Sequence, residues 1–71
     1  MKKLLKERLR ELRAAKEVGQ KEVAKAIGVS WRTISHYETG YSQPDLDIFI
    51  RLCVYFETTA DYLLGLKDYE T

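Results

Sequence analysis

The sequence predicts an all-α fold on the basis of three observations. Leu5, Leu9 and Leu12 recur at the i, i+4, i+7 spacing of an amphipathic helix, and further apolar stripes of this kind follow along the chain. Glycines stand where two of these stripes end, as they do at helix C-termini. The 71 residues, 45% hydrophobic and 32% charged, are enough for one small globular domain.

The first two helices are predicted from their apolar stripes. The first covers residues 2–16 and buries the three leucines. The second covers residues 20–27, where Val23 and Ile27 lie one turn apart on the same side. Gly28 ends it, because glycine accepts the left-handed backbone conformation that follows many helices.

A third, short helix is predicted over residues 31–39. Ser30 caps it, and Val29 and Ile34 have the spacing of a hydrophobic staple across that cap. Gly40 ends the helix. Because so short a helix is unstable alone in water, we expect it to dock through Ile34 and Tyr37.

The fourth predicted helix follows Pro44, with Asp45 as its N-cap. Its inward face is predicted to hold Leu46, Phe49, Leu52, Cys53 and Phe56. Apolar side chains also cover most of the remaining surface of this helix, at Ile48, Ile50, Val54 and Tyr55. A helix that is apolar on nearly all sides of so small a domain predicts a surface for a partner.

The fifth predicted helix is short and begins at a capping box in which Thr58 is the cap. Tyr62 and Leu63 are expected in the core, and Gly65 ends the helix. We therefore divide the chain into a domain over residues 1–66 and a short C-terminal tail over residues 67–71.

The composition excludes several classes of protein. The single cysteine excludes an intramolecular disulfide and a multi-cysteine metal site, and it fits a reducing compartment. No apolar run approaches 18 residues, so no membrane span is expected, and the basic N-terminus lacks the apolar core of a signal peptide. We expect a cytoplasmic protein with no cofactor, no metal and no small-molecule ligand.

The net charge of +1 hides an uneven distribution. Residues 1–40 hold 10 Lys and Arg against 5 Asp and Glu, whereas residues 41–71 hold 2 against 6. The basic half contains the predicted helix 31–39, and a local positive field attracts the phosphate backbone of nucleic acids. The same distribution is also expected of a first helix that is merely rich in solvated lysine and arginine.

The side of helix 31–39 opposite Ile34 is polar and carries Arg32, Ser35, His36 and Thr39, with Trp31 at its start. A helix of this kind, held across its neighbour by a glycine turn, suits the major groove of DNA. Spacing alone also fits an ordinary helical hairpin with a solvated face, because such hairpins occur in unrelated folds.

The segment from Gln20 to Gly40 resembles the helix-turn-helix of the Xre/Cro-type phage-repressor family. The resemblance rests on Gln20, Val23, Ala24, Gly28, Val29, Ser30, Ile34, Glu38 and Gly40, and it continues through Leu9, Leu12, Arg13, Pro44, Leu46, Phe49, Cys53, Phe56 and residues 61–64. It thus covers nearly the whole chain, from about Leu5 to Leu66. Two positions depart from the family pattern, since Cys53 is often alanine there and Trp31 replaces a residue that is commonly polar.

This resemblance implies a compact five-helix bundle, like the lambda-repressor DNA-binding domain. It further implies binding to double-stranded operator DNA, as a homodimer that regulates transcription, and we expect a repressor. The twofold symmetry of such a dimer predicts a pseudo-palindromic site. In the family, an arginine matching Arg13 pairs with a glutamate matching Glu38, and we expect this ion pair to be structural.

The resemblance also assigns roles to individual residues. Base contacts are expected from Trp31, Arg32, Ser35 and His36. Phosphate contacts are expected from Gln20, Lys21, Ser30, Thr39, Tyr41, Ser42 and Gln43. The last three residues also fit a polar surface turn before Pro44 nearly as well. Trp31 either packs on a thymine methyl group or sugar, or folds back over the turn into the core. For the dimer interface we expect Ile48, Val54, Tyr55, Leu64 and Leu66.

Two other classes of function compete with DNA binding. An enzyme is not expected, because His36 and Cys53 form the only possible Cys–His pair and Cys53 lies on the predicted core face, where a thiol is normally inert. No phosphate-binding loop, metal-ligand spacing or serine elbow is present. A protein-interaction module, or an antitoxin that binds both DNA and a toxin, would use the apolar fourth helix equally well and remains an alternative.

Overall fold

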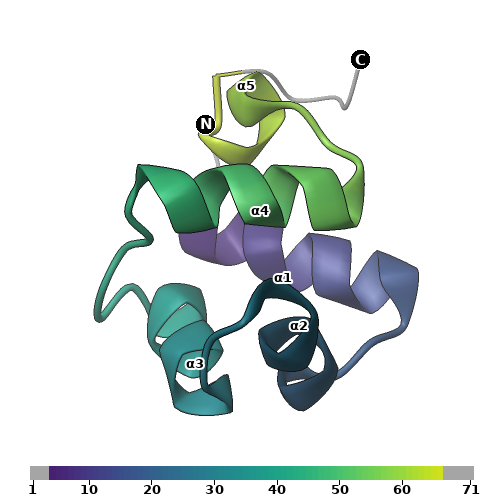
Figure 1. Ribbon diagram of the computed structural model, residues 1–71. Coiled ribbons are helices and arrows are strands. Elements are labelled where there is room, and N and C mark those ends of the chain that lie inside the picture. Colours follow the sequence, from purple (N-terminus) through teal and green to yellow (C-terminus); the bar gives the residue numbers. More distant parts are fainter. Residues whose placement is uncertain (1–3, 67–71) are drawn as a thin grey trace.

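The computed structural model describes residues 4–66, which form five α-helices and no strand (Figure 1). The helices are α1 (Leu5–Lys16), α2 (Gln20–Ile27), α3 (Trp31–Thr39), α4 (Leu46–Phe56) and α5 (Ala60–Leu63). The prediction of an all-α fold with five helices is confirmed. The predicted tail, residues 67–71, lies outside the described residues. None of the helices within residues 4–66 is long and apolar enough to cross a membrane.

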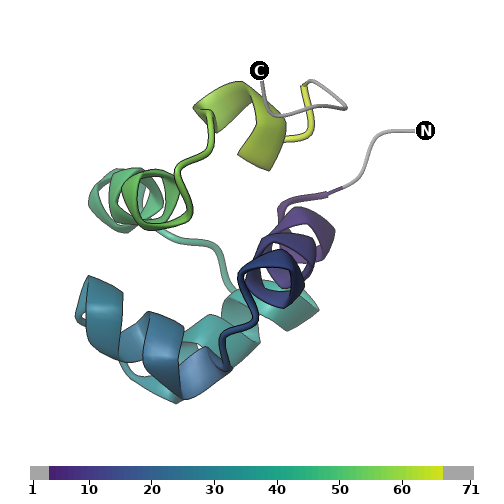
Figure 2. The same ribbon diagram turned by 90° about the vertical axis from the view of Figure 1, so that its right-hand side faces the viewer.

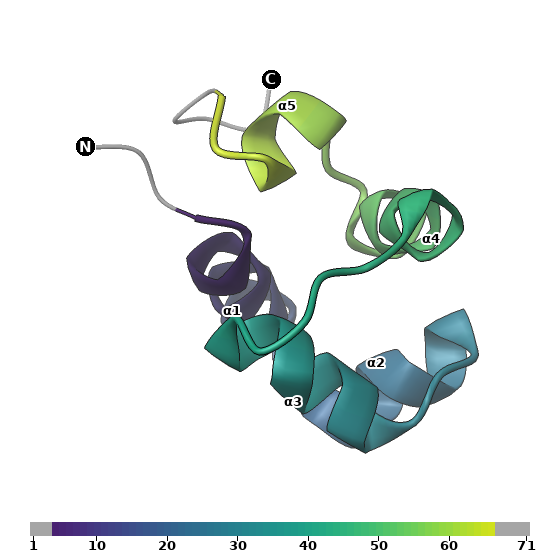
Figure 3. The same ribbon diagram turned by 90° about the vertical axis from the view of Figure 1, so that its left-hand side faces the viewer.

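The helices enclose a core from four sides. In Figure 1, α4 runs across the front of the molecule, α2 and α3 lie below it and α5 lies above it. The two side views show α1 and α4 as opposite walls, with the α2–α3 pair closing one edge between them and α5 the other (Figures 2 and 3). The α2–α3 pair therefore forms one whole end of the domain.

Each helix contributes one fully buried aliphatic side chain to the centre of the core. These side chains are Leu9, Val23, Ile34, Leu52 and Leu63. Because every helix contributes to the same cluster, the short helices α3 and α5, which would be unstable alone, are fixed by packing rather than by propensity.

The ends of α2, α3 and α4 have the caps that the sequence predicts. The Ser30 side chain accepts a hydrogen bond from Thr33 N, and the Asp45 side chain accepts one from Ile48 N. Gly28 and Gly40 take left-handed conformations, with φ of +85° and +81°. The interpretation of these residues as helix caps is confirmed.

Three local predictions are wrong. The first helix begins at Leu5, because Leu4 is an extended N-cap whose N–H donates to Glu7 Oε1 over 2.9 Å, so the predicted helix does not run continuously from residue 2. The cap of α5 is Thr59, which accepts from Tyr62 N, rather than Thr58. Leu46 is exposed rather than part of the core, because it lies about 120° around the helix from the buried Leu52.

Candidate nucleic-acid interface

The turn between α2 and α3 sets the angle of the second helix. Gly28 N–H and Val29 N–H both donate to Ala24 O, over 2.8 and 3.0 Å, which closes the C-terminal end of α2. Val29 packs against the core and Ile34 is fully buried, one on each side of the Ser30 cap. The chain therefore leaves α2 and enters α3 in a conformation that is fixed by hydrogen bonds and by packing.

One side of α3 is anchored in the core. Ile34 and Tyr37 are buried as the sequence predicts, and Glu38 next to them is also buried. Burial raises the pKa of the Tyr37 phenol, and the charge of Asp45 raises it further. The opposite side of α3 remains available to a ligand.

Arg13 on α1 binds Glu38 at the C-terminal end of α3 through two hydrogen bonds. Arg13 Nε lies 2.7 Å from Glu38 Oε2, and Arg13 Nη2 lies 3.0 Å from Glu38 Oε1. A third Arg13 nitrogen, Nη1, donates to Val18 O over 3.2 Å. The hydrogen bond to Glu38 raises the pKa of Arg13, although burial opposes the effect. The pair joins α1 to the C-terminal end of α3 and thus fixes that end of the helix.

Gln20 extends this network to the N-terminal end of α2. Its Nε2 donates to Glu38 Oε1 over 3.1 Å. Since an amide nitrogen carries two N–H groups, one donor can still point to another acceptor. The free N–H groups of the first turn of α2 lie at the same place, and such a helix end attracts anions.

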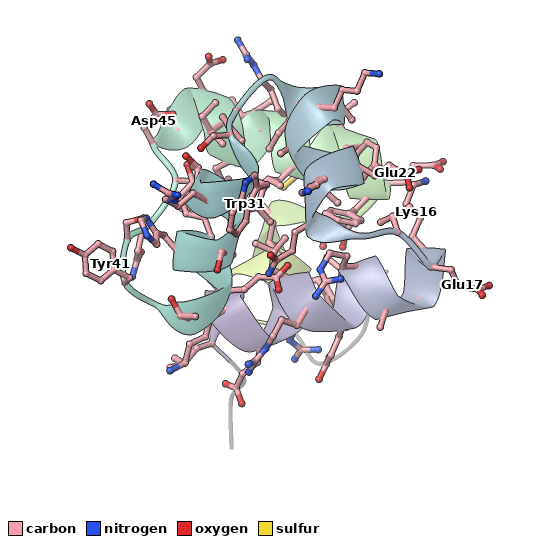
Figure 4. The ribbon with its side chains drawn as sticks, turned by 90° about the horizontal axis from the view of Figure 1, so that it is seen from below. Lys16, Glu17, Glu22, Trp31, Tyr41 and Asp45 are labelled. Atoms are coloured by element: carbon pink, nitrogen blue, oxygen red, sulfur yellow. The ribbon has the colours of Figure 1, made fainter. Side chains whose placement is uncertain are left out.

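The outward side of α3 carries the predicted base-contacting residues. Arg32 is exposed, and Ser35 and His36 are half-buried. Trp31 is 46% exposed and lies outside the buried core, with the Arg32 guanidinium carbon 5.7 Å from its ring centroid. Figure 4, which views the α2–α3 end from below, shows Trp31 near the middle of this end. The alternative in which Trp31 folds back into the core is wrong.

The C-terminal end of α3 and the following loop form a second group of polar residues. The His36 and Tyr41 rings are in contact, with centroids 4.6 Å apart, and Thr39 Oγ1 donates to His36 O over 3.2 Å. Tyr41 is exposed and points away from the bundle at the edge of the view in Figure 4. The ring contact links the loop to the outward side of α3.

The other predicted phosphate-contacting residues do not all lie together. Lys21 and Ser30 are exposed on the α2–α3 end, and the Ser30 hydroxyl is engaged with Thr33. Ser42 and Gln43 instead line a pocket of about 320 Å³ beside α1 and α5. The prediction that these two residues contact phosphate together with Tyr41 stays a prediction.

The predicted dimer-interface residues are spread over different environments. Ile48 and Tyr55 are partly buried against the core. Val54 and Tyr55 both line an open hollow between α2 and α4, whereas Leu64 lines the separate pocket beside α1 and α5. Leu66 is exposed. These five residues therefore do not form one continuous patch.

Two arginines support the fold without having been predicted to do so. Arg8 is buried, with its guanidinium carbon 4.1 Å from the Tyr62 ring centroid. Arg51 Nη1 donates to Ile27 O over 3.1 Å, and this hydrogen bond links α4 to the last turn of α2. Sequence gives little signal for either role, because both depend on contacts between distant segments. For Arg8, the sequence offers one hint: the residue directly precedes Leu9 and lies one helical turn before Leu12.

Within residues 4–66, no three His, Cys, Asp or Glu side chains are grouped as metal ligands would be. The Cys53 thiol is half-buried, and burial raises its pKa above the ordinary value of a thiol. A thiol in this state is a poor nucleophile.

Comparisons with known proteins agree with this geometry. A helix-turn-helix family model matches residues 9–63, which is most of the chain. Among curated relatives, the regulators ImmR and AnsR of Bacillus subtilis (strain 168), both described as HTH-type transcriptional regulators, are 38% and 39% identical over 64 and 59 residues. These matches cover 90% and 83% of this chain but 50% and 51% of the relatives, so the chain spans about half of their length.

Solved structures show the same fold. The P22 c2 repressor protein in complex with synthetic operator 9T superposes with a TM-score of 0.87 at 29% identity, over 92% of this chain and 98% of that one. A transcriptional regulator from Listeria innocua superposes with a TM-score of 0.83 at 29% identity, over 92% of this chain and 61% of the other. With its five-helix fold, its anchored α3 and these relatives, the chain belongs to the Xre/Cro-type helix-turn-helix family of DNA-binding transcriptional regulators.

Proposed function

We propose that this chain binds specific double-stranded DNA sequences with α3 in the major groove, and that it acts as a homodimeric repressor of transcription. The observation that carries the proposal is the position of α3. Its inner side is fixed by Ile34, Tyr37 and Glu38, and its outer side carries the exposed Arg32 and the half-buried His36. A helix fits the major groove, where base edges can be distinguished.

Arg32 and His36 are the residues that we expect to read bases. The Arg32 guanidinium can donate two parallel hydrogen bonds to guanine O6 and N7, which discriminates against other bases by about 1–3 kcal/mol. His36 can donate to or accept from a purine edge, and its contact with Tyr41 restricts the orientation of the ring. Trp31 and Ser35 are expected to add contacts to a thymine methyl group and to a neighbouring base.

Phosphate contacts position the helix rather than select the sequence. Gln20 has a second amide N–H beyond the one bound to Glu38, and it stands at the N-terminal end of α2, where a phosphate is favoured. Lys21, Ser30, Thr39 and Tyr41 are expected to bind phosphates on either side of the groove. Ser42 and Gln43 remain weaker candidates, because they line the pocket beside α1 and α5.

The proposed role in transcription is supported by what the relatives are named and by the DNA in one solved structure. The P22 c2 repressor was solved with operator DNA, and the curated relatives are named as transcriptional regulators. A homodimer would bind a pseudo-palindromic operator whose half-sites lie about one helical turn apart. A protein with this function is expected in the cytoplasm.

The proposal is tested by selecting bound duplexes from a random DNA pool and then comparing three variants on the selected site. Arg32→Ala should lose preference between bases at one position, by about 1–3 kcal/mol, because its loss removes a base contact. Gln20→Ala should weaken all sequences alike. Arg10→Ala, which removes the same charge from the exposed side of α1, is the matched control and should change neither property. Equal behaviour of Arg32→Ala and Arg10→Ala would contradict the assignment of α3.

A protein-interaction module, including an antitoxin that binds a toxin, is the second candidate, and the exposed apolar side chains of α4 favour it. Titration with random-sequence DNA at increasing salt separates the two. DNA binding driven by phosphate contacts falls steeply as salt rises. The absence of any salt-dependent binding at low salt would favour the second candidate.

A further inference from the structure

The outer face of α4 carries a row of apolar side chains that no other part of residues 4–66 covers. Leu46, Ile50 and Val54 are 74%, 52% and 72% exposed, and they follow one another at intervals of four residues. This spacing places them on one ridge of the helix, here called the α4 ridge. Beside it, Ile50 and Val54 line an open hollow of about 330 Å³ between α2 and α4. A continuous exposed apolar row of this kind marks an interaction surface.

The geometry points to a second copy of this chain as the occupant of the α4 ridge, with the two α4 helices packed antiparallel about a twofold axis. The inference deepens the proposed DNA-binding function and rests on it for the role of the dimer. Of the five interface residues expected from sequence, it keeps Val54 and replaces the other four with Leu46 and Ile50.

The α4 ridge is complementary to itself under such an axis. Antiparallel helices centred on Ile50 place Leu46 against the partner's Val54, and Ile50 against the partner's Ile50. Ridges spaced by four residues pack into one another at the commonest helix crossing angle. Every exposed apolar side chain of the ridge is therefore covered by an apolar side chain of the partner.

Charges beside the ridge favour the same arrangement. Asp47 and Arg51 lie next to each other on one side of it, with Asp47 Oδ2 3.0 Å from Arg51 Nη2, and both remain substantially exposed. Antiparallel packing brings the partner's Arg51 to the end that carries Asp47, so opposite charges meet across the axis. Parallel packing about a twofold axis would instead place the two Asp47–Arg51 pairs on opposite sides of the contact, so this pairing of opposite charges would be lost.

The position of α4 makes this dimer compatible with one DNA duplex. The side views show α4 as an outer wall, with the α2–α3 pair at one of its edges (Figures 2 and 3). A twofold axis that passes between antiparallel α4 helices lies in the contact plane and is perpendicular to them. Both α2–α3 pairs then lie at the same edge of the dimer and face the same side.

The size of the ridge predicts the strength of the dimer. A stable interface buries about 800 Å² on each partner, which three side chains cannot supply alone. The dimer is therefore weak in solution and forms when two half-sites on one duplex bring two copies together. Binding to such a duplex is cooperative.

Disulfide trapping tests the interface directly. Ile50→Cys and Leu64→Cys are each introduced into a Cys53→Ala chain, and the two replaced side chains are matched, since both are 52% exposed. Under mild oxidation on a duplex with two half-sites, Ile50→Cys should form a covalent dimer and Leu64→Cys should not, because only position 50 faces its own copy across the axis. Faster trapping at position 64, or no trapping at position 50, overturns the inference.

A Leu46→Glu variant tests the role of the ridge in DNA binding. Because Leu46 is exposed, the variant should keep the fold, which circular dichroism checks. Its affinity for a single half-site should be unchanged, while its affinity for two half-sites falls by about 5- to 150-fold, the range of a typical coupling between sites. Unchanged affinity for two half-sites, or an equal loss on one half-site, overturns the inference. If the unmodified chain binds no DNA, the proposed function fails, and trapping at position 50 in concentrated protein without DNA still decides the interface.

Discussion

Replacing Arg13 with methionine should destabilise the domain more than replacing its partner Glu38 with leucine. The two side chains are unequally buried, since 3% of the Glu38 side chain is exposed but 26% of the Arg13 side chain. Without Arg13, the Glu38 carboxylate stays buried with only the Gln20 amide as a donor. Without Glu38, the Arg13 guanidinium can still turn partly to water.

The magnitudes follow from this difference. Removing one partner of a buried ion pair costs about 3–5 kcal/mol, and Arg13→Met should fall in this range because it strands a buried charge. Glu38→Leu should cost less, about 1–3 kcal/mol, because the stranded group is partly hydrated. The double variant should cost less than the sum of the two, because replacing a whole buried pair by apolar side chains is often nearly neutral.

Urea unfolding followed by circular dichroism measures all three free energies, and each kcal/mol corresponds to about 4–8 °C in the melting temperature of a domain of this size. Arg13→Lys is the control for charge alone. It should recover only part of the loss, because lysine cannot form the two parallel hydrogen bonds that Arg13 makes. The reasoning is refuted if Glu38→Leu costs more than Arg13→Met, or if the effects of the two single changes are additive.

Three further changes test other features of the fold. Gly40→Ala should lower the free energy of unfolding by about 1–2 kcal/mol in urea titrations, since φ is +81° and the new Cβ would lie 3.2 Å from Lys6 Cδ; an unchanged midpoint contradicts this. Glu57→Gly should raise the free energy of unfolding by about 0.5–1 kcal/mol, because Glu57 holds a left-handed φ of +52° at the end of α4. A lower melting temperature for this variant would show that the Glu57 side chain contributes more than the backbone strain costs. Burial raises the pKa values of Tyr37 and Cys53, so both ionise more readily in the unfolded chain. Stability should therefore fall as pH rises through their ordinary values of about 8.5–10, which melting curves measure, and Tyr37→Phe should reduce the fall; stability that is flat or rising from pH 8 to 10 contradicts the assignment.

Local chemistry explains which parts of the fold the sequence could predict. Ser30 and Asp45 were identified as caps because a cap bonds to the backbone three residues away, and both partners are visible in the sequence. The capping-box pattern favours Thr58, because Asp61 lies three residues after it, yet Thr59 is the cap in the structure. Leu46 has the spacing of a core residue, but α4 starts there and the core lies around the other side of the helix.

Contacts between distant segments limit how much of the candidate DNA-binding site can be predicted from the sequence. The outward position of Arg32 and His36 could be predicted, because their places on the helical wheel opposite Ile34 depend on the sequence of a single helix. The ring contact of His36 with Tyr41 and the hydrogen bond of Arg51 to Ile27 depend on how loops and helices meet, which no spacing encodes. The sequence groups Ser42 and Gln43 with Tyr41 but gives no sign that both also line the pocket beside α1 and α5.

Titration of the isotope-labelled chain with its selected duplex, followed by amide chemical shifts in NMR spectra, tests the central claim most directly. The account predicts the largest changes along α3 and the loop after it, from Trp31 to Tyr41, and at the first turn of α2 around Gln20. Changes that are confined to α4 and α5, with the amides of α2 and α3 unmoved, would contradict it.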